Sequence, residues 1–138
     1  MKTNKLTLIA ILLAFTSSFT SCKDDDTEPV IETPPVQFDI SSPTTGSMYH
    51  LNDTVFIKAK ISHTEELHGY EVSIVNISQN DTLVFNKHAH LDGTDFQIDE
   101  YWINNVSGHS NMKLIIDAIT DHSGAKESSE LSFHCHPM

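Results

Sequence analysis

The sequence predicts an all-β fold, a β-sandwich of about seven strands that follows a signal peptide and a disordered tether. Three observations support this prediction. Residues 38–138 repeat an alternation of apolar and polar residues and have no convincing helical period. Turn residues divide the alternating runs at regular intervals. The chain has 138 residues, of which 38% are hydrophobic, and this suits one globular domain.

The expected strands follow one another along the chain, each with apolar residues at every second position. In the second strand Val55 and Ile57 share one face, and Lys58 lies on the other. The sixth, Met112–Thr120, is apolar on both faces, as expected for a central strand. Turns are expected at residues 80–81, 92–93 and 121–124. The predicted strands are 38–40, 54–61, 68–77, 83–90, 96–102, 112–120 and 131–136.

Two segments are expected before this domain. Lys2 and Lys5 precede the apolar run Leu6–Phe15, the pattern of a cleavable secretory signal, and the run is too short to span a membrane. We therefore assign residues 1–21 to a signal peptide. Residues 22–37 are rich in Asp, Glu, Thr and Pro, which predicts an extended acidic tether. The sandwich domain then occupies residues 38–138.

The residues around Cys22 resemble a known export signal. Phe19-Thr20-Ser21-Cys22 is similar to a bacterial lipobox, although Phe19 stands where Leu is usual and Thr20-Ser21 replaces Ala-Gly. The sequence Cys22-Lys23-Asp24-Asp25-Asp26 resembles the acidic export signal of surface-exposed lipoproteins of the Bacteroidota. This resemblance implies that Cys22 is lipidated, which makes the membrane a partner. It also implies an outer-membrane location with exposure on the cell surface.

The end of the chain resembles a second known pattern. A buried strand, the turn Asp121-His122-Ser123-Gly124 and a final strand look like the last hairpin of bacterial immunoglobulin-like and fibronectin-type modules. The whole chain is similar to short Bacteroidota surface lipoproteins with an immunoglobulin-like domain, a family of unknown function. The resemblance implies the location and an immunoglobulin-like sandwich, and it implies no chemistry.

Charge excludes some classes of partner. The 8 basic residues face 19 acidic ones, for a net charge of −11, and all the basic residues are lysines. Nucleic-acid binding needs a basic face, so we expect no nucleic-acid partner. An acidic surface attracts cations instead. The chain also contains 9 histidines, more than its lysines and arginines together.

Two His-x-His triplets are the most specific local pattern. They are His88-Ala89-His90 and His134-Cys135-His136. Residues two apart on a strand share a face, so each triplet presents two imidazoles side by side. Leu83 and Phe85 indicate the inward parity of the fourth strand, which leaves His88 and His90 outward. In the last strand Cys135 falls on the core side, unless a twist or bulge returns it to the histidines.

Strand order sorts the histidines into two groups. Successive strands run in opposite directions, so one end of the sandwich is expected to gather His63, His68, His88, His90 and His122. The other is expected to gather His50, His109, His134 and His136, with Met112 and Met138 nearby in sequence. Imidazole and sulfur ligands suit copper or zinc, the expected cofactors. The candidate ligands are His68, His88, His90, His122, His109, His134, Cys135 and His136.

The leading prediction is therefore a surface-tethered lipoprotein that captures, buffers or delivers copper or zinc. One alternative is a non-enzymatic adhesion or glycan-binding module of an outer-membrane complex, for which Tyr101-Trp102 offers a stacking platform. A core position for Trp102 is the simpler explanation of that residue. Another alternative is haem capture through axial His or Met ligands. No nucleophile-elbow, phosphate-loop or His-Glu-x-x-His motif is found, so we do not expect an enzyme.

Overall fold

The computed structural model describes residues 34–137, which contain eight strands and one short 3-10 helix. The predicted signal peptide, the predicted lipidation site Cys22, most of the predicted tether and Met138 lie outside the described residues. The strands are β1 (Gln37–Ser42), β2 (Met48–His50), β3 (Thr54–Leu67), β4 (Tyr70–Asn76), β5 (Thr82–Ala89), β6 (Gly93–Ile103), β7 (Ser110–Ile119) and β8 (Lys126–His136). The helix, η1 (Ile77–Gln79), joins β4 to β5.

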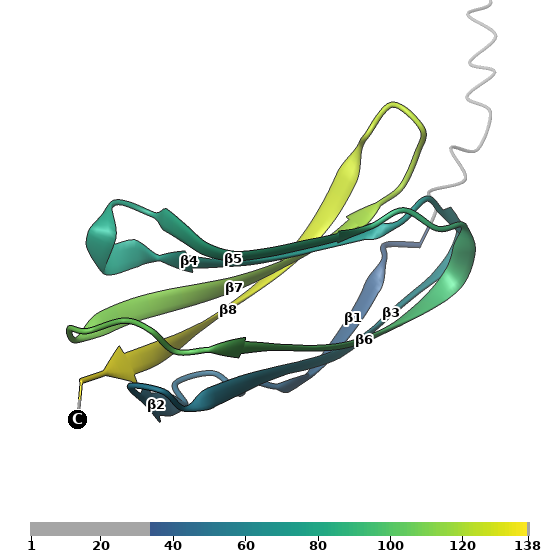
Figure 1. Cartoon of the computed structure of the whole chain (residues 1–138). Coiled ribbons are helices and arrows are strands. Elements are labelled where there is room, and N and C mark those ends of the chain that lie inside the picture. Colours follow the sequence, from purple (N-terminus) through teal and green to yellow (C-terminus); the bar gives the residue numbers. More distant parts are fainter. Residues whose placement is uncertain (1–33, 138) are drawn as a thin grey trace, which may run out of the picture. The chain divides into compact units, whose positions relative to one another are not determined.

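The strands form an immunoglobulin-like β-sandwich, which confirms the predicted fold class. One sheet has three strands in the order β1-β3-β6, and the other has five in the order β2-β8-β7-β4-β5. Neighbouring strands pair antiparallel except β2, which runs parallel to β8. Figure 1 shows the two sheets as layers, with the C-terminal end of β8 and the start of β1 at opposite ends.

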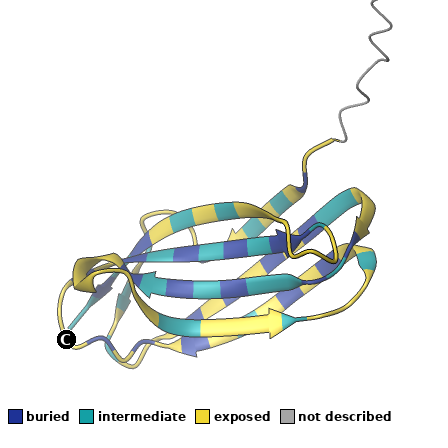
Figure 2. Ribbon diagram, turned by 90° about the horizontal axis from the view of Figure 1, so that it is seen from above, coloured by how far each residue is buried: buried dark blue, intermediate teal, exposed yellow. Residues whose placement is uncertain are grey.

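The core lies between the sheets and is built by strand alternation. Along β3, Val55, Ile57, Ala59 and Ile61 are buried, and the residues that alternate with them are exposed. Leu114 and Ile116 of β7 face them from the other sheet, in a single cluster of buried residues. Figure 2 shows this as alternating buried and exposed bands along the strands. One face of each sheet is thus left for solvent or a partner.

The N-terminal boundary differs slightly from the predicted one. Val36, which the sequence analysis assigns to the tether, is 6% exposed and belongs to the core. Its backbone N–H donates to Glu127 Oε2, at a distance of 3.0 Å. The sandwich therefore begins at Val36, because this apolar residue can be buried against the core once a partner for its N–H is available.

Strand β2 was not predicted. Its three residues are too few to show an alternating pattern. It is a strand because Met48, Tyr49 and His50 pair in parallel with residues 134–136 of β8. Beside this pairing, the backbone N–H of His134 donates to the Ser47 carbonyl oxygen at 2.9 Å. The inward ring of Tyr49 packs edge-on against Phe133, with 5.7 Å between the ring centroids.

The predicted inward position of Leu83 is wrong. The pairing of β4 with β5 shifts register, because Ile74 lies opposite Phe85 whereas Val75 lies opposite Leu83. This leaves Val84 as an extra residue in β5, a β-bulge that reverses the parity of the residues before it. Leu83 is consequently 56% exposed, whereas Phe85 packs against the core as predicted.

Candidate functional site

The end of the five-stranded sheet at β2 and β8 carries two rows of outward side chains. Tyr49 and Cys135 lie opposite each other and face the core. Their neighbours therefore face outward, with Met48 opposite His134 and His50 opposite His136. Strand β7 extends the row of Met48 and His134, because Asn111 lies opposite His134.

His136 is the centre of this group. Its ring centroid lies 4.7 Å from that of His109, 6.4 Å from that of His50 and 6.5 Å from that of His134. The Nδ1 atoms of His136 and His109 are 2.7 Å apart, so one ring donates an N–H to the other. The predicted gathering of four histidines at this end is therefore found.

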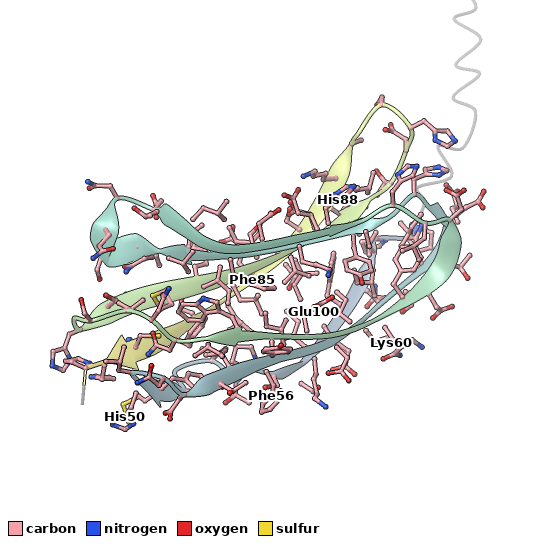
Figure 3. The ribbon with its side chains drawn as sticks, in the orientation of Figure 1. His50, Phe56, Lys60, Phe85, His88 and Glu100 are labelled. Carbon is pink, nitrogen blue, oxygen red and sulfur yellow. The ribbon has the colours of Figure 1, made fainter. Side chains whose placement is uncertain are left out.

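Three of these histidines line a surface depression of about 310 Å³, which we call the His136 hollow. It is lined by Met48, His50, His109, His136 and Pro137. His134 is not among the lining residues, and its Nδ1 donates to the Asn111 amide oxygen at 2.9 Å. Figure 3 shows His50 projecting from this end of the molecule.

The environment of His136 favours the uncharged imidazole. Its pKa is lowered, first by desolvation and then by the neighbouring His109, His50 and His134. Uncharged imidazole is the form that ligates metals.

At the opposite end of the sandwich, two predicted ligands are stacked. The rings of His68 and His122 have centroids 3.8 Å apart. His68 Nδ1 donates to Asp92 Oδ1 at 2.9 Å. This hydrogen bond holds the pKa of Asp92 below its usual value, and the nearby charges of His68, His122 and His90 act in the same direction. The end thus forms an imidazole–carboxylate group around Asp92.

His63 and His88, which were predicted at the same end, have other surroundings. His63 Nε2 lies 2.9 Å from the carbonyl oxygen of Pro34, where the chain enters the domain. His88 lies opposite Glu71 on the outward face of the five-stranded sheet, and Figure 3 shows it pointing away from the other sheet. The predicted outward position of His88 is correct, but the five histidines do not share one site.

Cys135 does not return to the histidine side. The pairing of β7 with β8 is regular from Ser110–Cys135 to Ile119–Lys126, so no bulge reverses the parity. Cys135 is fully buried, and desolvation raises the pKa of its thiol to about 11. Met112 is also fully buried in the core. Neither sulfur is available as a ligand in this arrangement, because both belong to the inward face.

Within residues 34–137, no three His, Cys, Asp or Glu side chains are grouped so as to hold a metal ion. The eight predicted ligands are thus divided. His109, His134 and His136 lie at the β2–β8 end. His68 and His122 are stacked at the other end, where His90 also lies near Asp92. His88 lies on the outward face of β5, and Cys135 lies in the core. Met48 also lies at the β2–β8 end, where it lines the His136 hollow. The sequence analysis did not predict this position, because the three residues of β2 show no recognisable alternation.

A second candidate site is the outer face of the three-stranded sheet. Phe56 of β3 lies opposite Tyr101 of β6, and Thr54 lies opposite Ile103. Phe56, Tyr101 and Ile103 are 51%, 61% and 51% exposed. We call these three residues the aromatic face, and Figure 3 shows Phe56 pointing away from the five-stranded sheet. Exposed apolar residues grouped in this way are typical of binding surfaces.

The aromatic face adjoins a polar depression of about 450 Å³. Lys58 follows Phe56 by two residues on the same strand face and forms an ion pair with Asp99 at 3.6 Å. Lys60 forms a second ion pair, with Asp95 at 3.1 Å. Polar and charged residues that line the depression are Asp39, Ser41, Lys58, Lys60, Gln97 and Asp99.

Trp102 belongs to the core and not to a surface platform. It is 7% exposed, and its partner across the strands is the fully buried Val55. Strand alternation turns Tyr101 outward and Trp102 inward. Of the predicted Tyr101-Trp102 platform only Tyr101 is exposed, and Phe56 takes the place of the second ring.

Comparisons with known proteins give a structural similarity only. No family model and no curated protein matches the chain. One similar structure is the CARDB domain of the PF1109 protein of Pyrococcus furiosus, solved in complex with di-metal ions. It is 12% identical, with a TM-score of 0.46, and the match covers 78% of this chain and 90% of that one.

Another similar structure is that of the fibronectin(III)-like modules of CbhA from Clostridium thermocellum. The identity is 17% and the TM-score 0.43, over 73% of this chain and 94% of that one. In residues 34–137 no helix is long and apolar enough to cross a membrane.

Proposed function

We propose that this chain is a lipid-anchored surface protein whose immunoglobulin-like domain is a non-enzymatic binding module for carbohydrate. The observation that carries the proposal is the cross-strand pair of exposed aromatic rings, Phe56 and Tyr101. Two rings fixed on neighbouring strands form a flat apolar surface at little cost in side-chain entropy. The apolar face of a sugar ring can stack on such a surface.

The polar depression beside the rings supports the same occupant. Sugar hydroxyl groups need both donors and acceptors, and the depression offers lysine ammonium groups, carboxylates, the Gln97 amide and the Ser41 hydroxyl. Its lysines are joined to carboxylates in ion pairs, so the surface is mixed in charge and not strongly basic or acidic. A neutral, hydroxyl-rich ligand matches this surface better than a highly charged one.

A binding role, and not catalysis, follows from the same groups. Both surface depressions lie open on the outside of the sandwich, over sheet and strand ends. Among the residues that line the polar depression, Lys58 pairs with Asp99, Lys60 pairs with the neighbouring Asp95, and no thiol or imidazole is present. A nucleophile activated by an adjacent base is therefore not part of this face.

Copper or zinc capture is the second candidate function. It is favoured by the group of four histidines formed by His136 and its neighbours His50, His109 and His134. It has less support than carbohydrate binding, because the described residues lack a three-ligand group of His, Cys, Asp or Glu. Haem capture stays a prediction.

Carbohydrate binding is tested by affinity electrophoresis of residues 23–138 in gels that contain xylan, laminarin or mucin glycans. Residues 23–138 include every core residue of the described sandwich. At least one polysaccharide should retard the protein, and Tyr101→Ala and Phe56→Ala should each abolish the retardation. Leu83→Ala is the matched control, because Leu83 is 56% exposed but lies on the other sheet. Equal migration of all variants in every gel contradicts the proposal.

The anchor is tested separately in cells. Cys22→Ser should remove incorporation of labelled fatty acid and release the protein from the membrane fraction. Protease added to intact cells should digest the unaltered protein if it lies on the cell surface. Retention of the label in the Cys22→Ser variant would contradict the predicted attachment site.

A further inference from the structure

We infer that the His136 hollow is a binding site for a soft monovalent metal ion, Cu(I) or Ag(I), with His109, His136 and Met48 as its ligands. The site lies on a different surface from the aromatic face and does not depend on carbohydrate binding. Its residues come from three separate segments: Met48 from β2, His136 from β8, and His109 from the connection that precedes β7. The fold brings them together, although 88 residues separate Met48 from His136.

The first step of the argument is the pair of imidazoles. The Nδ1 atoms of His109 and His136 converge to 2.7 Å, and their ring planes are nearly perpendicular, at 86°. Two nitrogens that each lie about 2 Å from one metal ion are roughly 3.4 Å apart. The two Nδ1 atoms must therefore move apart by roughly 0.7 Å, from 2.7 Å, to hold an ion between them. His109 is exposed, so its ring can make this movement without displacing the core.

The second step is the position of Met48. This residue is 65% exposed, the highest value among the large apolar residues of the described chain. It lines the same hollow as both imidazoles. An exposed methionine buries little apolar surface, so packing does not account for its place beside the histidines. Its thioether adds a sulfur donor to the imidazole nitrogens that line the hollow.

The third step is the choice of metal. Thioether sulfur binds soft ions such as Cu(I) and contributes little to Zn(II) or Mg(II). Among residues 34–137 no carboxylate lines the hollow, and the third imidazole that lines it, that of His50, has its Nδ1 3.6 Å from Asp53 Oδ2. Two imidazoles and a thioether therefore suit a three-coordinate soft ion, whereas a harder ion would lack ligands in this hollow.

The fourth step separates ligands from neighbours. His134 shares the strand face, but its Nδ1 is occupied by Asn111, and it does not line the hollow. His88 lies on the outward face near Glu71, on β5. Both residues are consequently controls for the general affinity of surface histidines for metals.

The test protein is residues 23–138 carrying the substitution Cys135→Ala. Ag(I) and Cu(I) are titrated into it separately under anaerobic conditions. The Cys135→Ala change ensures that the buried thiol contributes no signal. A competing chromophoric chelator reports affinity, and the Met48 methyl resonance reports contact with the ion. We expect one ion per chain and a shift of that resonance. Met48→Leu, His109→Gln and His136→Gln should each weaken binding at least tenfold, and His134→Gln and His88→Gln by less than threefold.

Three results would overturn the inference. The first is that the protein fails to retain Cu(I) or Ag(I) against the chelator. The second is that the Met48→Leu variant and its parent bind the ion with equal affinity. The third is that His88→Gln and His136→Gln lower the affinity by equal factors. Circular dichroism of each variant distinguishes loss of the site from loss of the fold. If Cys135→Ala does not fold, the same titration is carried out with the thiol present, and Met48→Leu is compared directly with its parent.

Discussion

The face of a β-strand on which a side chain lies determines whether it can bind a ligand in this domain. Cys135 lies between His134 and His136, yet it faces the core while they face outward. The sequence predicts this parity, because Leu131 and Phe133 already mark the inward face of the last strand. The proposed return to the histidine side required an irregularity that β8 does not have.

A first prediction concerns the Cys135 thiol. Its pKa is raised to about 11 from an ordinary value of 9.0. At pH 8 this lowers the fraction of reactive thiolate about a hundredfold, and burial slows access further. Residues 23–138 contain no other cysteine, so Ellman's reagent reports on this thiol alone. The native protein should react at least a hundredfold more slowly than the protein unfolded in about 6 M guanidinium chloride. Similar rates in both solutions would contradict the buried position.

A second prediction concerns Gly69. Its φ is +136°, and a Cβ at this position would lie 2.2 Å from the carbonyl oxygen of Ala89. We expect Gly69→Ala to lower the free energy of unfolding by about 2–4 kcal/mol, because the backbone of β5 must move. Gly124→Ala is the control: its φ is +88°, but a Cβ there meets nothing within 4 Å, and its cost should be about 1 kcal/mol. Equal costs in urea unfolding would exclude the steric explanation.

At the scale of elements, β2 depends on one buried amide. Asn104 is fully buried, and its Nδ2 donates to the carbonyl oxygens of Tyr49 and His50, at 3.3 and 2.9 Å. Its Oδ1 accepts from the backbone N–H of Val106. The residue thereby joins the end of β2 to the segment that follows β6.

We therefore expect Asn104→Ala to destabilise the protein by about 2–4 kcal/mol, since it leaves buried backbone groups without partners. It should also weaken binding of Ag(I), because Met48 lies on β2. Asn105→Ala is the matched control, as Asn105 is exposed in the same segment and should cost less than about 0.5 kcal/mol. Chemical denaturation followed by tryptophan fluorescence measures both. A neutral Asn104→Ala variant would show that β2 does not need this amide.

The elements differ in how well the sequence predicts them. Strands such as β3 and β7 have long apolar patterns, and their existence and faces were predicted from periodicity. Strand β2 has three residues, and the bulge at Val84 leaves no mark in composition. Strand β2 arises from pairing with the distant β8, and the bulge arises from the register of β5 on β4, and one sequence reveals neither. The His136 hollow was half predicted for this reason: its histidines had a signal, and Met48 had none.

At the scale of the molecule, acid should weaken the fold through its carboxylates. The hydrogen bond from Lys126 lowers the pKa of Glu71 below its ordinary value of 4.5. A carboxylate with a lowered folded-state pKa stabilises the fold above its unfolded-state value, and this contribution disappears as pH falls through the folded-state pKa. Asp92 and Asp121, whose pKa values are also lowered, act in the same direction below their ordinary value of 3.8.

The fourth prediction follows from Glu71. The melting temperature of the parent should fall between about pH 5 and pH 3, and the fall should be smaller in Glu71→Gln, which has no proton to gain. Differential scanning fluorimetry at several pH values measures both proteins. Parallel curves would show that the Glu71–Lys126 pair does not contribute to acid sensitivity.

The fold also places the entry of the chain and the His136 hollow at opposite ends of the sandwich. The chain enters at Pro34, next to His63, whereas the His136 hollow lies at the far end, beside the end of β8 (Figure 1). Under the proposed lipidation of Cys22, the domain is tethered through Pro34, and the His136 hollow lies at the end of the sandwich opposite that residue. A partner that delivers or accepts a metal ion would then meet the hollow at the end of the domain where the chain does not enter.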